Sequence, residues 1–168
     1  MAMTSGIAAV LLVSASLTQP VTHDSREFVK AAIETNYADI AIGKLALEKG
    51  TSEAVRQYGA LLVRQHSDAN ERAKDAASRL AIVPPTGAGA YGKVLLINLS
   101  ALSGETFDRE FVNGMLTDHE SDMKDYLMQA QKTDAAGVLA KDTLPALMVE
   151  FKQAKSLAQG TPQRQSMH

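Results

Sequence analysis

Apolar side chains recur every three to four residues over four long stretches of this 168-residue chain, and this periodicity constrains the fold more than any other feature. No stretch alternates apolar and polar residues with the period of two that a β-strand requires. Four amphipathic helices of about 25 residues would each be about 37 Å long, which suits a shared core. The pattern therefore predicts an all-α four-helix bundle.

Turn-forming and capping residues indicate where the helices begin and end. The expected helices run from a capping box at Asp24 and Glu27 to about Lys49, from a cap at Thr51 or Ser52 to about Leu80, from Lys93 to Leu102, from Thr106 to Lys132, and from Asp134 to about Ala158. Pro145 should kink the last helix or split it in two. Two tight turns predict two antiparallel hairpins, and the breaker-rich segment 83–92 joins them. This long connection leaves the helix order open between up-down-up-down and a ferritin-like arrangement with a crossover.

The N-terminal segment has the pattern of a secretory signal peptide. Residues 1–20 carry no charged side chain, and the apolar run 6–13 is followed by the small residues Ser14, Ala15 and Ser16. No Lys or Arg precedes the apolar run, so the alternative is an apolar N-terminal segment without a targeting role. We predict a signal peptide at 1–20, a bundle domain at 21–160 and a flexible tail at 161–168. The mature protein would be periplasmic or otherwise exported, without a stable membrane span.

Composition excludes several classes of function. The chain has no Cys, which excludes thiolate catalysis, disulfides, zinc fingers and iron–sulfur ligation. Aromatic residues make up 5%, Trp is absent and the net charge is −2, so no nucleic-acid partner is expected.

One ionisable side chain interrupts the apolar stripe of each long helix. These residues are Asp39, His66, His119 and Glu150, with Asp122 one turn beyond His119 toward the edge of its stripe. Counted from the turn near residue 51, Asp39 lies 12 residues before it and His66 lies 15 after it. His119 lies 14 residues before the turn near residue 133, and Glu150 lies 17 after it. Each pair is mismatched by about 4.5 Å along the axis, so the four side chains should converge in one layer.

Two arrangements would compensate for burying these groups. Imidazole and carboxylate ligands suit a divalent metal ion, namely zinc, iron or manganese. The alternative is a hydrogen-bonded His–carboxylate network with a purely structural role. In the metal hypothesis Asp39, His66, His119 and Glu150 are direct ligands. Asp122 is then an extra ligand or an outer partner, and Asn70 lies where it could orient His66.

A dinuclear enzyme fits the sequence less well than a single metal ion. Dinuclear carboxylate bundles use a Glu-x-x-His motif twice, whereas Val63 and Leu116 precede the two histidines here by three residues. An oxidase-type enzyme would need a second metal or an open coordination position. We therefore do not predict an enzyme.

Several segments together resemble the bacterial domain of unknown function 4142 family. They are Phe28 with the run 39–46, His66 and Asn70, the run 102–104 with Phe107 and Asp108, Asp118 with His119, and Leu144 with Pro145. Members are typically exported and are often labelled ferritin-like, which implies a ferritin-like four-helix bundle of two antiparallel hairpins joined by a long crossover. The family commonly has Glu at position 39, Asp at position 65 and His at position 150, where this chain has Asp39, Gln65 and Glu150.

The family carries no general activity that can be transferred to this chain. We expect an exported ferritin-like bundle protein that binds one divalent metal ion in its core. The alternative is a non-enzymatic envelope or stress-related module whose core network is purely structural.

Overall fold

The computed structural model describes residues 23–160. Within that range the chain forms helices and no strand, which confirms the all-α prediction. The helices are α1 (His23–Lys49), α2 (Glu53–Arg79), α3 (Ala90–Ser100), α4 (Gly104–Gln129) and α5 (Ala135–Gly160). The predicted signal peptide at 1–20 and the predicted tail at 161–168 lie outside the described residues.

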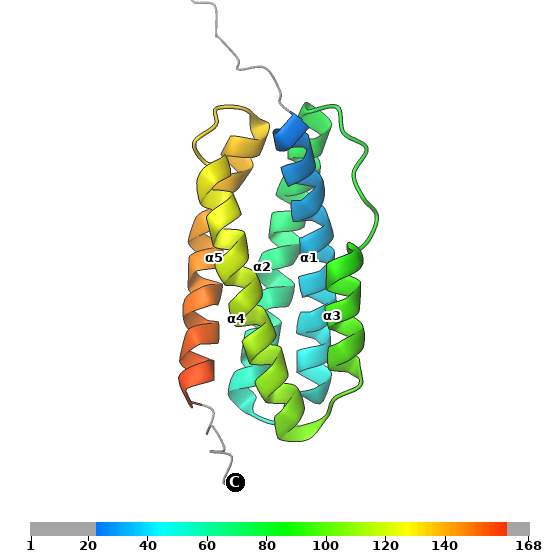
Figure 1. The fold of residues 1–168 in the computed structure, drawn as a ribbon, viewed down its shortest axis with the longest axis vertical. Coiled ribbons are helices and arrows are strands. Elements are labelled where there is room, and N and C mark those ends of the chain that lie inside the picture. Colours follow the sequence, from blue (N-terminus) through cyan, green and yellow to red (C-terminus); the bar gives the residue numbers. More distant parts are fainter. Residues whose placement is uncertain (1–22, 161–168) are drawn as a thin grey trace, which may run out of the picture.

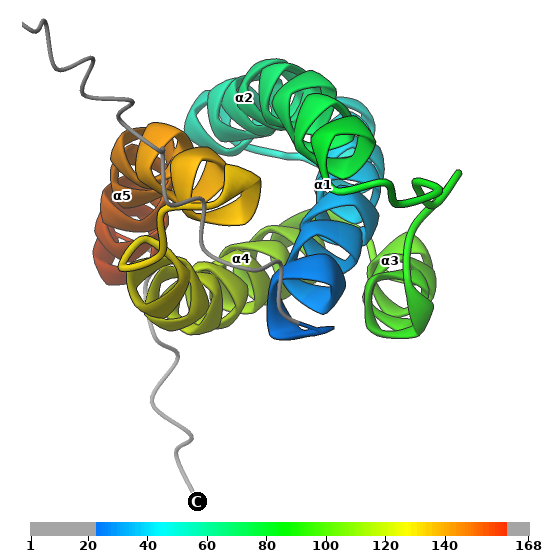
Figure 2. The same cartoon turned by 90° about the horizontal axis from the view of Figure 1, so that it is seen from above.

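The four long helices form a bundle of two hairpins (Figure 1). Helices α1 and α2 pair antiparallel, as do α4 and α5, while α2 packs against α5 and α1 against α4. Between the hairpins the chain returns along the outside of α1 through α3, so that α2 and α4 run in the same direction. Seen from above, α3 lies outside the ring of four helices (Figure 2). Of the two helix orders open from the sequence, the structure has the ferritin-like one with a crossover.

Most of the predicted helix ends are confirmed. The Ser52 side chain accepts a hydrogen bond from the Val55 backbone N–H at 3.2 Å, and Asp134 accepts one from the Gly137 N–H at 2.9 Å. The predicted capping box at the start of α1 is wrong. That helix already begins at His23, which places Asp24 in its first turn, where it pairs with Lys132.

Helix α5 is not split by Pro145. A proline removes one backbone hydrogen bond of a helix, and packing along both neighbouring helices maintains the remainder. The expected splitting of this helix at Pro145 therefore does not occur.

Helices α1 and α2 approach each other closely at a pair of glycines. A Cβ atom on Gly43 would lie 2.8 Å from the Gly59 carbonyl oxygen, and one on Gly59 would lie 2.7 Å from the Gly43 carbonyl oxygen. Any larger side chain at either position would push the helices apart. The close approach fixes the relative height of the two helices in the half of the bundle nearer the α1–α2 turn.

The apolar core has two parts, one toward each end of the bundle. One contains Val29, Ile33, Ala73, Leu139 and Leu147 among others. The other contains Ile42, Leu62, Phe107, Phe111 and Met115 among others. A layer of polar side chains lies between them, near the middle of each long helix. No helix within residues 23–160 is both long enough and apolar enough to cross a membrane.

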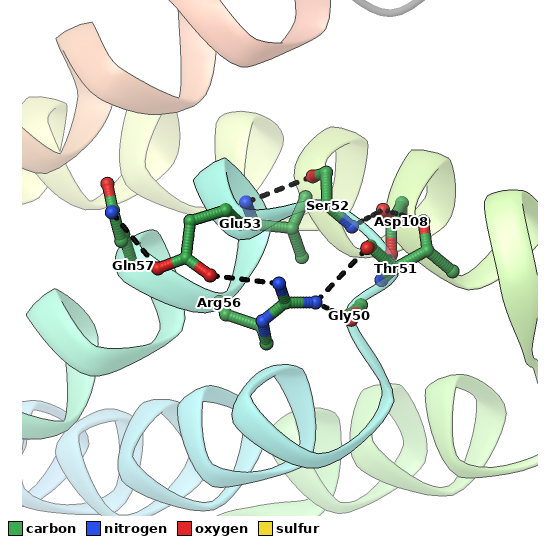
Figure 3. Close-up of polar contacts among 8 residues, drawn as sticks. Gly50, Thr51, Ser52, Glu53, Arg56, Gln57 and Asp108 are labelled. Atoms are coloured by element: carbon green, nitrogen blue, oxygen red, sulfur yellow. Dashed lines mark hydrogen bonds and ion pairs between the residues drawn. The ribbon is translucent and has the colours of Figure 1, made fainter.

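Asp108 ties the second hairpin to the turn of the first (Figure 3). Its carboxylate accepts hydrogen bonds from the Thr51 N–H at 2.9 Å, the Thr51 hydroxyl at 2.6 Å and the Ser52 N–H at 3.1 Å. Asp108 belongs to α4 and is 8% exposed, so these bonds are largely shielded from water. They hold the start of α4 against the α1–α2 turn and so help to set the register between the hairpins.

Replacing Asp108 with Ala should therefore destabilise the fold. The Asp108→Ala variant leaves two backbone N–H groups without their acceptor, and we expect the free energy of unfolding to fall by about 2–3 kcal/mol. Urea unfolding followed by circular dichroism measures this. The exposed Asp68 of α2 provides a matched control, because Asp68→Ala removes the same charge and should change stability by about 0.5 kcal/mol or less. Equal effects of the two substitutions would contradict the role assigned to Asp108.

Candidate metal centre

The four predicted residues meet between the two apolar clusters, one from each long helix. Asp39 (α1) and His119 (α4) are 0% exposed, Glu150 (α5) is 2% exposed and His66 (α2) is 6% exposed. The His66 Nε2 atom lies 3.3 Å from Asp39 Oδ2 and 3.5 Å from Glu150 Oε2. The His119 Nε2 atom lies 3.8 Å from the same Glu150 oxygen. The structure therefore brings together all four side chains that interrupt the apolar stripes.

Asn36 determines how the His66 ring presents its nitrogens. Its side-chain oxygen lies 2.9 Å from His66 Nδ1, so Nδ1 carries the proton and donates it to Asn36. In the neutral ring Nε2 then carries a lone pair, and that lone pair faces two carboxyl groups. This is the arrangement of a metal-ligating histidine, whose other ring N–H is held by an oxygen.

Asn36 was not among the residues expected from the sequence, which pointed to Asn70 instead. The side-chain oxygen of Asn70 is buried and accepts no hydrogen bond within the described chain. Asn36 lies one turn before Asp39 on α1, and a search for amides adjacent to each candidate ligand would have found it. Its role depends on a partner on another helix, which the periodicity of α1 alone does not reveal.

Most polar atoms of the cluster make no hydrogen bond within residues 23–160. These atoms are both carboxyl oxygens of Asp39, Nε2 of His66, both ring nitrogens of His119 and Oε1 of Glu150. Buried polar atoms are normally paired, because losing water without a replacement partner costs about 1–3 kcal/mol per group. The close approach of these groups therefore does not form a complete hydrogen-bonded network within the described residues.

Burial dominates the electrostatics of the carboxyl groups. It raises the pKa of Glu150 to about 8, with the charge of Asp122 adding to the effect. Burial also raises the pKa of Asp39 well above its usual range, helped by the charges of Asp118, Asp122 and Glu150. In the described chain, the charges that act on these two groups come from other carboxyls rather than from Lys or Arg.

The same burial acts in the opposite direction on the imidazoles. It lowers the pKa of His66 to about 3, with a further contribution from His119, and lowers that of His119 to about 4. Burial disfavours the charged form of an imidazole as well as that of a carboxyl group. His66 is thus neutral at pH 7, so its contacts with Asp39 and Glu150 are not salt bridges.

Helix α4 contributes two further carboxyl groups. Asp39, Asp118, His119 and Asp122 place one potential ligand atom each within 4.8 Å of one another, and His66, His119 and Glu150 do the same. Burial raises the pKa of Asp122 to about 7, with Asp118 and then Asp125 adding to it, and raises that of Asp118 to about 6. Asp122, expected as an extra ligand or outer partner, therefore lies in the cluster.

Asp118 is the cluster member that the helical periodicity of the sequence did not indicate. It occurs beside His119 in the family-like motif but lies off the centre of the apolar stripe of α4. Its position one turn before Asp122 was the signal available, since residues four apart share a helix face.

A small cavity of about 10 Å³ adjoins the cluster, and its lining includes Asn36, His66, Asp122, Tyr126 and Glu150. This is about the space needed for one water-sized particle. The lining offers nitrogen and oxygen atoms from all four long helices, so the space suits a small cation.

No curated protein matches the chain. Among solved structures, a fragment of a DUF305 protein from Deinococcus radiodurans is similar, with 15% sequence identity and a TM-score of 0.73. The alignment covers 84% of this chain and 99% of that one. At this identity the likeness supports the helical fold alone.

The family comparison covers most of the chain. Residues 12–157 match the model of a domain of unknown function, DUF4142, a range that includes every residue of the cluster. The chain therefore belongs to the DUF4142 family.

Proposed function

We propose that this protein is an exported helical-bundle protein that binds a divalent metal ion in its core. Asp39, His66, His119 and Glu150 would be the ligands, with Asp122 beside them. The mixed set of imidazole and carboxylate groups suits zinc, iron or manganese.

The observation that carries this proposal is the orientation of His66. With its Nδ1–H donated to Asn36, the bare Nε2 atom faces Asp39 Oδ2 at 3.3 Å and Glu150 Oε2 at 3.5 Å. The lone pair on Nε2 repels each of these carboxyl oxygens unless a proton or a cation lies between them. A divalent cation could be held by His66, His119 and Glu150, whose ligand atoms lie within 4.8 Å of one another, and it would also lower the cost of burying the carboxylates.

Export rests on the pattern of residues 1–20 and is a separate part of the proposal. We expect the full-length chain, expressed in a Gram-negative host, to appear in the periplasmic fraction with a mass reduced by cleavage near residue 20. Replacing Leu11 and Leu12 with Arg should abolish this, because the apolar run of a signal peptide does not tolerate charge. An uncleaved chain confined to the cytoplasm would contradict export and leave the metal proposal standing.

Metal binding should be measured on chelator-treated protein reloaded with Zn²⁺, Fe²⁺ or Mn²⁺. For the wild type we expect stoichiometric retention of at least one of these ions after desalting. At a free metal concentration about 1,000 times Kd, binding should add about 4 kcal/mol of stability and raise Tm by roughly 10 °C. The His66→Ala variant should lose this retention, whereas Gln57→Ala, on an exposed position of the same helix, should keep it.

A purely structural network gives a different result in the same experiment. Chelator would leave Tm unchanged, and no ion would be retained by the wild type. Either finding, after reloading with all three metals, would overturn the metal proposal.

The pH dependence of stability should change sign when metal is bound. Between pH 6.5 and 8 the metal-free folded chain still holds protons on Glu150 and Asp122, with pKa values of about 8 and 7, while the unfolded chain has lost them. The unfolded state therefore binds fewer protons, and stability should fall with rising pH by about 2 kcal/mol over this window. The two imidazoles oppose this fall by less than about 1 kcal/mol in total, because they are neutral in the folded chain and lose about half a proton each in the unfolded chain over this window.

With metal bound the slope should reverse. Metal binding displaces the protons from the carboxyl groups, so raising the pH strengthens binding and adds stability. Urea unfolding at pH 6.5, 7.2 and 8.0, with and without chelator, measures both slopes. A structural network predicts identical slopes in the two conditions.

A further inference from the structure

The buried cluster consists of two overlapping sets of potential ligands. One set is rich in nitrogen and contains His66, His119 and Glu150; the other is rich in oxygen and contains Asp39, Asp118, His119 and Asp122. Within each set, one ligand atom per residue lies within 4.8 Å of the others. His119 belongs to both sets, is 0% exposed and has two ring nitrogens that make no hydrogen bond within residues 23–160.

Asp39 connects the two sets. It belongs to the oxygen-rich set, yet its Oδ2 atom lies 3.3 Å from Nε2 of His66 in the nitrogen-rich set. Both of its oxygens are buried and make no hydrogen bond in the described chain. A carboxylate with two available oxygens can bridge two cations about 3.5–4 Å apart.

The charge of the cluster also points to more than one cation. Asp39, Asp118, Asp122 and Glu150 place four carboxyl groups around His119, and three of them have ligand atoms within 4.8 Å of it and of one another. One divalent ion would neutralise two of these groups in their ionised form. A second divalent ion would neutralise the other two and leave the buried cluster without net charge, which greatly lowers the cost of burying it.

The number of potential ligands also agrees with two cations. Dinuclear carboxylate bundles combine four carboxylates with two imidazoles, and the two sets here together contain the same numbers. The distribution differs, since α2 supplies only His66 whereas α4 supplies Asp118, His119 and Asp122. The chain therefore lacks Glu-x-x-His motifs because its carboxylates are distributed differently among the helices, although the same number of carboxylates reaches the core.

The oxygen-rich set is also accessible from outside the bundle. A cleft of about 210 Å³ lies between α1 and the start of α3, lined in part by Glu34, Thr35, Tyr91 and Asp118. Asp118 therefore belongs both to the cluster and to the cleft. A hydrated cation entering the cleft would meet the carboxyl group of Asp118 before it reached His119.

We infer that the core of this protein holds two divalent cations, the second of them bound by Asp39, Asp118 and Asp122 with His119 at the shared edge. The inference rests on the proposed metal function and extends it from one ion to two. The nitrogen-rich position suits zinc or iron, while the oxygen-rich position suits a harder cation such as Mn²⁺. Asp39 bridges the two positions.

The test uses the full chain, chelator-treated and titrated with Mn²⁺ alone. Elemental analysis after desalting should give two Mn²⁺ ions per wild-type chain, and the electron paramagnetic resonance spectrum should show the magnetic coupling of two nearby ions. The Asp118→Asn variant should retain one ion and give an uncoupled spectrum. The matched Asp125→Asn variant, on an exposed position of the same helix, should retain two.

Each alternative result has a definite meaning. One ion per wild-type chain, unchanged by Asp118→Asn, would overturn the second position and leave the proposed function intact. No retained ion in the wild type, with Zn²⁺ and Fe²⁺ also failing, would overturn both proposals. Because Asp118 is half-buried at the edge of the cluster, the conservative Asn substitution should leave the helical circular dichroism spectrum unchanged. Should that spectrum change, Asp122→Asn provides the same test from the next turn of α4.

Discussion

Within residues 23–160 the fold is organised around a polar layer in which no Lys or Arg offsets the charges acting on Asp39 and Glu150. Four carboxyl groups and two imidazoles lie between two apolar clusters, and burial pushes all of them toward their neutral forms. An apolar layer would have stabilised a bundle of this size without that cost. This uncompensated layer, held in place by the rest of the bundle, is what supports the proposed metal site.

Several features of the scaffold keep that layer in register. The paired glycines Gly43 and Gly59 let α1 and α2 pack closely, which fixes Asp39 relative to His66. At one end of the bundle, Asp108 holds the start of α4 against the turn of the first hairpin. Rigid helices carry these constraints to the middle of the bundle, where shifts of about 1 Å decide whether ligand atoms share a cation.

The comparisons with known proteins establish the family and the helical fold, but they do not indicate the chemistry of the buried cluster. The DUF305 fragment shares the helical arrangement at 15% identity, which says nothing about ligands. Among this chain's own residues, Glu150 adds a fourth carboxyl group to the two imidazoles and three aspartates of the cluster. A carboxylate at this position makes the cluster more acidic, and in the proposed metal site it would favour harder cations.

Helical periodicity and the positions of the turns were sufficient to predict from the sequence the four long helices, the hairpins and the layer containing Asp39, His66, His119 and Glu150. These follow from distances along the chain, because a helix has a fixed rise and a fixed rotation per residue. Only the tertiary structure decided that Asn36 rather than Asn70 holds His66, and that Asp118 joins the cluster from the edge of its helix. Both depend on how neighbouring helices rotate and pack against each other, and the pattern of a single helix contains no information about that rotation.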